Sequence, residues 1–153
     1  MKAASSGKTL YLEDIAVGDA FRSGEHRLDA EQIIAFASQF DPQPFHTDPQ
    51  AAKNSFFQGL AASGWHIVAI TMRLLVESVP FADGIIGAGT ELSWPTPSRP
   101  GDILHVESKV MEIRPSRSKP DRAIVTLESL TFNQNDATRL KLLSRLVAFR
   151  KPD

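Results

Sequence analysis

The chain has 153 residues, enough for one domain that buries roughly 70% of the surface its unfolded form exposes. A net charge of -1 and a pI near 6.4 provide no basic field for nucleic acid or an anionic membrane surface. The absence of cysteine excludes disulfides, zinc–thiolate sites and a thiol nucleophile. No apolar run approaches the ~20 residues that span a bilayer, and MKAASSGKTL lacks the apolar stretch of a secretory signal. We therefore expect a cytoplasmic protein with a flexible start over residues 1–9 and a single domain over residues 10–153.

The first clear element is a helix over residues 30–40, after a short strand-like pattern in FRSGEHRL. Asp29 is a suitable N-cap, and Gln32 three residues later completes the pattern of a capping box. Pro42 and Pro44 end this helix and predict that the following segment is extended and stiff. Apolar residues recur on one face of the predicted helix: Ile33, Ile34, Phe36, Ala37 and Phe40.

A second, longer helix is predicted over residues 63–79, with Ser63 as its N-cap. Its sequence is apolar almost all the way round until Arg73, which is typical of a helix buried within a domain. Pro80 and the pair Asp83-Gly84 end it. Four alternating segments follow, separated by Pro, Gly or Asn-Asp turn signals: IIGAGTELSW, DILHVESKVMEIR, RAIVTLESLTFNQ and TRLKLLSRLVAFR. They predict an antiparallel meander whose apolar face the long helix covers, which is an α+β fold.

Between the two helices lies the proline-rich stretch QFDPQPFHTDP. Asp41 and His46 are five positions apart, and a stiff segment can turn both side chains toward one cleft. A carboxylate beside an imidazole is a general acid/base pair. The alternative is a helix-ending loop in which Asp41 caps a turn and His46 is merely exposed. Asp48 could join them as a metal ligand, but no second histidine lies at a recognised ligand spacing, so we expect no metal.

The run DPQPFH resembles the Asp-x-Asn-Pro-x-His signature of the MaoC-like family, which includes (R)-specific enoyl-CoA hydratases and related dehydratases. The similarity extends over most of the chain. The preceding FASQF resembles the end of the family's first helix, GLAASGWHIVAITMRLL the start of its central helix, and SWPTPSRPGDILHVESKVMEIR its Pro-x-x-Pro-Gly-Asp turn into a long strand. The resemblance implies a hot-dog fold, in which an antiparallel sheet wraps around a long central helix. It also implies a homodimer or larger homo-oligomer with active sites near the subunit boundary.

The resemblance further implies a hydro-lyase of fatty acid metabolism that acts on acyl-CoA or acyl carrier protein thioesters, without a metal or redox cofactor. Water would be added across, or removed from, the Cα=Cβ bond. Asp41 and His46 would handle the water and the Cα proton, and the backbone N–H of Gly64 would bind the thioester carbonyl. A helix N-terminus suits that role because its N–H groups are unpaired and carry partial positive charge.

The chain departs from the family pattern at two places. Gln43 stands where the signature usually has Asn, and Ser63 and Trp65 flank Gly64 where many members read His-Gly-Met. We expect Trp65 and Phe45 to line and reshape the acyl pocket, because both flank the motif.

Two other candidate residues are expected to have structural rather than functional roles, and two alternative functions remain. We expect His66 to be a hydrogen-bonded structural residue, and Arg99 to lie on a solvated surface rather than on CoA phosphates. A hot-dog thioesterase usually carries its catalytic carboxylate on or near the central helix, but here the first acid of that helix is Glu77, near its far end. A non-catalytic acyl-CoA binding module is the alternative from another class.

Overall fold

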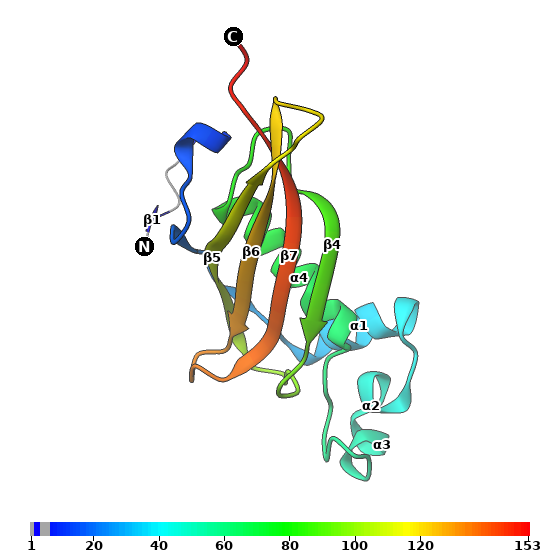
Figure 1. The fold of residues 1–153 in the computed structure, drawn as a ribbon. Helices are drawn as coiled ribbons and strands as arrows, with labels where there is room; N and C mark the ends of the chain where they lie inside the picture. The colour runs from blue at the N-terminus through cyan, green and yellow to red at the C-terminus, as the bar shows by residue number, and fades with distance from the viewer. Residues whose placement is uncertain (1, 4–6) are drawn as a thin grey trace.

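The computed structural model describes residues 2–3 and 7–153. The expected flexible start falls partly on residues 1 and 4–6, which lie outside the described residues, while residues 2–3 pair in parallel with a later strand. Figure 1 shows the arrangement of the elements. In chain order they are β1 (Lys2–Ala3), η1 (Leu12–Asp14), β2 (Ala20–Arg22), β3 (His26–Arg27), α1 (Ala30–Phe40), α2 (Pro44–Thr47), α3 (Pro49–Lys53), α4 (Gly64–Ser78), β4 (Ile86–Ser93), β5 (Ile103–Pro115), β6 (Arg122–Phe132) and β7 (Thr138–Phe149).

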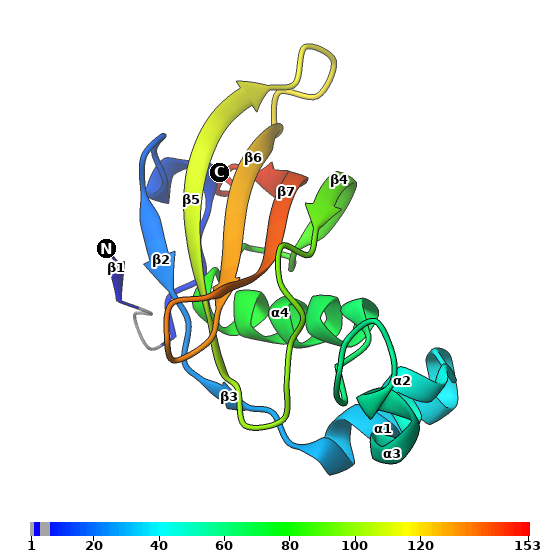
Figure 2. The same ribbon diagram turned by 90° about the horizontal axis from the view of Figure 1, so that it is seen from below.

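One curved sheet carries the fold, in the strand order β1-β2-β5-β6-β7-β4, and β3 also pairs with β5. The long strands β5, β6, β7 and β4 pair antiparallel with their neighbours, as the alternating sequence patterns predict. Along β6, buried and half-buried residues alternate without exception, because successive side chains point to opposite faces of a sheet. Figure 2 shows the sheet arching over α4, with α1, α2 and α3 gathered at one end of that helix. The expected α+β class is therefore confirmed.

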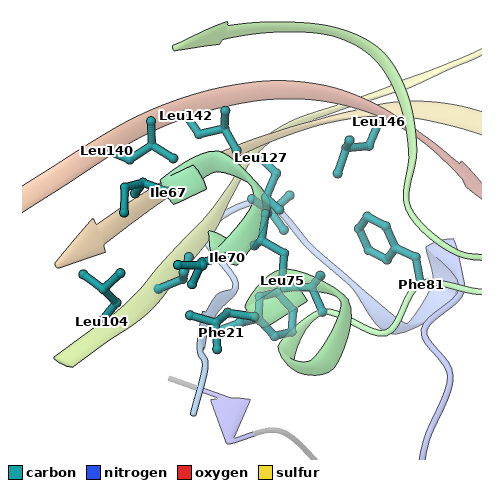
Figure 3. Packing of buried hydrophobic residues seen from close by; sticks show 14 of the residues in the cluster. Phe21, Ile67, Ile70, Leu75, Phe81, Leu104, Leu127, Leu140, Leu142 and Leu146 are labelled. Carbon is teal, nitrogen blue, oxygen red and sulfur yellow. The ribbon is translucent and has the colours of Figure 1, made fainter. Parts of the chain in front are cut away.

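The core lies between α4 and the concave face of the sheet. Figure 3 shows Ile67 and Ile70 of α4 directed toward Leu104 of β5 and the leucines of β6 and β7. Burying each such side chain stabilises the fold by about 1.5–3 kcal/mol. Thr71 and Thr131 are also fully buried, and their hydroxyls hydrogen-bond each other at 2.6 Å, so neither is left without a partner. These contacts fix α4, and with it the position of its N-terminus.

Only one side of α4 is buried in the single chain. Trp65 is 58% exposed, Met72 42% and Val76 53%, and these apolar residues form a stripe along the outer side of the helix. The predicted burial of this helix within the domain is therefore confirmed for one side only, because a single-layered sheet covers a helix from one side.

The local signals around α1 are partly confirmed. Asp29 caps the helix by accepting from the Gln32 N–H at 2.8 Å. The Gln32 side chain does not reach back to close a capping box; it donates to the Arg27 carbonyl instead. The prediction of an extended segment after Pro42 is wrong, because Pro44 and Pro49 begin α2 and α3. Proline suits that first helical position, where its fixed φ is helical and its missing N–H would have no partner.

Candidate active site

Asp41 lies at the C-terminal end of α1 and joins three parts of the chain. Its Oδ1 accepts from Gln43 Nε2 at 2.6 Å, and its Oδ2 accepts from the Ser63 hydroxyl at 2.7 Å. The same Oδ2 lies 3.3 Å from His46 Nε2. The carboxylate is thus held between α2 and the start of α4, and the predicted pair of Asp41 and His46 is brought together.

The surroundings of Asp41 set its protonation state. Partial burial raises the pKa of the carboxyl group, but the hydrogen bonds from Gln43 and Ser63 and the charge of His46 outweigh that effect. The net result is a pKa below the ordinary value for aspartate. Asp41 is therefore ionised at neutral pH and acts as an acceptor.

His46 is 5% exposed and its ring orientation is fixed from both sides. Its Nδ1 lies 2.6 Å from the Ala61 carbonyl oxygen. Because a carbonyl oxygen only accepts, Nδ1 carries a proton, and Nε2 is the atom that faces Asp41. A charged His46 donates from this Nε2 toward Asp41; once Nε2 has given up that proton, its lone pair can take a proton from a water bound beside Asp41. The Phe45 ring stands edge-on to the imidazole, with the centroids 4.6 Å apart.

Gly64 begins α4, and within the described part of the chain its N–H has no hydrogen-bond partner. Ser63 occupies the N-cap position but makes no capping bond, since its hydroxyl donates to Asp41. The Trp94 indole lies over Gly64 and donates to its carbonyl at 3.0 Å. A Cβ at Gly64 would meet that ring at 2.4 Å, so only glycine fits beneath it. The backbone donor predicted at this position is therefore available.

These groups border a pocket of about 540 Å³. The predicted residues Asp41, His46, Gly64 and Trp65 line it, whereas Gln43 and Ser63 lie behind Asp41. Phe45, which we expected in the lining, is not part of it and packs against His46 and the core. The remaining lining is mostly apolar and comes from three segments: Phe56, Phe57, Ala62, Ile67, Trp94, Pro95, Thr96, Pro97 and Ser98.

Sequence reasoning missed Trp94, and it expected neither Phe57 in the pocket lining nor Arg99 against the backbone. Trp94 stands perpendicular to Trp65, with 5.5 Å between ring centroids, so the two tryptophans form one wall of the pocket. Arg99, expected on a solvated surface, is only partly exposed and donates to backbone carbonyls of the segment that carries Phe57. The available signal was the break WPTPSRPGD, where a tryptophan and an arginine stand among prolines between two strands.

His66 differs from its expected hydrogen-bonded role. Its ring stacks on Phe36 at 4.6 Å between centroids, and its buried Nδ1 has no hydrogen-bond partner among the described residues. Burial, with a smaller contribution from the charge of His26, lowers the pKa of His66 to about 4. Among all the described residues, no cluster of three His, Asp or Glu side chains could hold a metal ion. Nor does any described helix have the length and apolarity to traverse a bilayer.

Several known proteins are similar to this chain in sequence or in structure. The crystal structure of a MaoC-like dehydratase from Rhodospirillum rubrum is 61% identical and superposes with a TM-score of 0.93, covering 94% of this chain and 99% of that one. An (R)-hydratase from A. caviae involved in PHA biosynthesis is 28% identical, with a TM-score of 0.72 over 90% of this chain and 98% of that one. The uncharacterized protein YdeM of Bacillus subtilis is 33% identical over 130 residues, which are 83% of this chain and 90% of that protein.

The structural matches confirm the hot-dog architecture that the sequence resemblance implied. The family model described as "MaoC like domain" matches residues 14–131, a span that contains the whole pocket from Asp41 to Ser98. The chain belongs to the MaoC-like domain family.

Proposed function

We propose that this chain is an (R)-specific enoyl-CoA hydratase, or the equivalent 3-hydroxyacyl-thioester dehydratase. The observation that carries the proposal is the placement of Asp41 Oδ2 3.3 Å from His46 Nε2, in a pocket that the start of α4 also borders. Family membership and the similarity to an (R)-hydratase support it. The proposed reaction uses no metal or redox cofactor.

The proposed chemistry balances as a simple addition of water. Water held by hydrogen bonds to Asp41 and His46 gives one proton to this pair as its oxygen bonds to Cβ of the enoyl thioester. Negative charge then develops on the thioester oxygen, where the N–H of Gly64 stabilises it. The pair returns a proton to Cα, which completes the 3-hydroxyacyl thioester. Dehydration is the same path in reverse.

The proposed substrate is an acyl thioester of CoA or of acyl carrier protein. The apolar lining suits an acyl chain, and the polar end formed by Asp41, His46 and Gly64 suits its thioester and β-carbon.

The proposed assembly is a homodimer or a larger homo-oligomer. The exposed apolar stripe of α4 and the edge strand β4, whose residues are mostly exposed, both favour association. Light scattering should give a mass of at least two chains, and a stable monomer at micromolar concentration would contradict the expected assembly.

The thioesterase alternative has less support. Glu77, the first acid of α4, is exposed at the far end of the helix, where its Oε1 lies 3.3 Å from Arg73 Nε. It does not line the pocket. A non-catalytic acyl-CoA binding module would keep the pocket and lack turnover.

One assay separates the three functions. Purified chain is mixed with crotonyl-CoA and with longer enoyl-CoA substrates, while enoyl absorbance and free thiol are followed together. A hydratase removes the double bond and releases no thiol. Thiol release identifies a thioesterase, and neither signal, together with saturable binding of butyryl-CoA, identifies a binding module. Either of the last two results would reject the proposed reaction.

A further inference from the structure

The guanidinium of Arg99 is bound to backbone rather than to a carboxylate. Its Nη1 donates to the carbonyls of Gly59 at 2.9 Å and Leu60 at 3.3 Å, and its Nη2 donates to the carbonyl of Phe57. These acceptors lie about 40 positions earlier in the chain than Arg99. One side chain therefore ties together two segments that the sequence keeps far apart.

The tied segments form two walls of the pocket. Phe56 and Phe57 line it from one segment, and Pro95 to Ser98 line it from the other. The Phe57 ring lies 5.1 Å from the Phe45 ring and 6.0 Å from the His46 ring, next to the proposed acid/base group.

The first segment has few other means of holding its shape. Residues 54–60 lie outside regular helix and strand, and Gln58 and Gly59 have positive φ. The Phe57 N–H donates to the Ser55 hydroxyl, and the Gln58 N–H donates to the Ser55 carbonyl, which are contacts within the segment itself. Arg99 supplies the hydrogen bonds that connect this turn to the opposite wall. Just beyond the turn, the Ala62 N–H donates to the Ser98 carbonyl at 3.0 Å, so the two walls also meet there.

Arg99 is in turn fixed by a buried ion pair. Its backbone N–H donates to Asp102 Oδ2 at 2.9 Å. Asp102 also accepts two hydrogen bonds from Arg139, at 2.9 and 3.1 Å, and one from Asn133 at 3.1 Å. The wall that carries Arg99 is thus rigid, and the wall that carries Phe57 takes its position from it.

We propose that Arg99 is a positioning residue that sets the width of the acyl pocket by holding Phe57 against the wall formed by residues 95–98. The role depends on the planar guanidinium, which directs several N–H donors at once; the lysine ammonium carries the same charge but lacks this fixed fork. The inference rests on the proposed function only for the nature of the ligand. The competing role for Arg99 is a contact with the phosphates of CoA.

The test compares Arg99→Lys and Arg99→Ala with the wild-type chain. Arg122→Lys is the matched control, because Arg122 pairs with the exposed Asp121 in the β5–β6 turn and does not line the pocket. Each protein is assayed with enoyl thioesters of CoA and of N-acetylcysteamine, which has no phosphate. Hydrogen exchange of the Phe57 and Gln58 amides is measured in the same proteins without substrate.

We expect KM to rise about tenfold for both thioesters in Arg99→Lys and Arg99→Ala, with kcat changed less than about threefold, because the lost contacts with the acyl chain are equal in the ground state and the transition state. The two amides should exchange at least about tenfold faster, while Arg122→Lys matches the wild type. A higher KM for the CoA thioester alone would identify a phosphate contact and overturn the proposal. Unchanged amide exchange would overturn it as well.

The same experiment separates this proposal from the function itself. If the wild-type chain hydrates neither thioester, the proposed reaction fails. The role of Arg99 is then decided by calorimetric binding of butyryl-CoA and butyryl-N-acetylcysteamine together with the amide exchange. Equal weakening of both ligands supports positioning, and weakening of butyryl-CoA alone refutes it.

Discussion

Replacing Gly64 by alanine tests the packing at the start of α4. The added Cβ would lie 2.4 Å from Trp94 Cε2 and 2.7 Å from its Nε1, although ordinary carbon contacts are about 3.5 Å or longer. The indole must therefore retreat by about 1 Å, which weakens its 3.0 Å hydrogen bond to the Gly64 carbonyl. Overpacking of this kind typically costs about 1–3 kcal/mol. For a chain of this size the melting temperature should fall by about 2–12 °C.

Thermal unfolding and enoyl-CoA hydration are measured together on Gly64→Ala. Hydration should slow at least about tenfold, because Trp94 forms part of the pocket and its shift misplaces the substrate. Gly87→Ala is the control, since a Cβ there meets nothing within 4 Å and should leave both values unchanged. In a Trp94→Ala background the cost of Gly64→Ala should vanish. An equal loss of stability in both backgrounds would refute the steric argument.

Three further changes test the electrostatics. Ser63→Ala removes a hydrogen-bond donor to Asp41 and raises the pKa of that carboxyl group, so the acid limb of kcat/KM should move to higher pH in a pH–rate profile. An unmoved limb would contradict this. His66 has a pKa of about 4 in the folded state and near 6.5 in the unfolded state, so only the unfolded state takes up a proton on this histidine as pH falls through 6.5. The free energy of unfolding should therefore fall by about 3 kcal/mol between neutral pH and pH 4. Urea titrations at pH 7 and 4.5 should show a smaller fall in His66→Gln than in the wild type. An equal fall in the free energy of unfolding in His66→Gln and in the wild type would contradict this. Arg139→Met leaves Asp102 buried without its cation, which should cost about 3–5 kcal/mol in chemical unfolding, and Asp102→Asn in the same chain should recover part of it. If the double variant is no more stable than Arg139→Met, an uncompensated charge on Asp102 is not the cause of the loss.

Elements set by local periodicity could be predicted from the sequence. The helix expected over residues 30–40 matches α1, and the one expected over 63–79 matches α4 within a residue at each end. The four alternating segments became β4 to β7. Local side-chain spacing suffices for such elements, because one face of each must be buried whatever its partner is.

Features that depend on distant contacts could not be predicted. The Ser63 hydroxyl could either cap its own helix or donate to Asp41, which lies 22 positions away in the sequence. Which of the two hydrogen bonds forms depends on the folded position of Asp41. Trp94 reaches Gly64 across 30 positions, and Arg99 reaches Gly59 across 40. The prolines were misread for a different reason: proline is compatible both with an extended segment and with the first position of a helix.

The central claim is that Asp41 acts with His46 on a water molecule. It is tested most directly by the hydration rate of Asp41→Asn with crotonyl-CoA, beside Glu77→Gln as a carboxylate-to-amide control on the exposed end of α4. Asparagine keeps the shape of the side chain and can still accept from Ser63, so the folded structure should persist. We predict that kcat/KM falls at least ~10²-fold in Asp41→Asn and is unchanged in Glu77→Gln. A rate for Asp41→Asn within about threefold of the wild type, on a folded protein, would contradict the account.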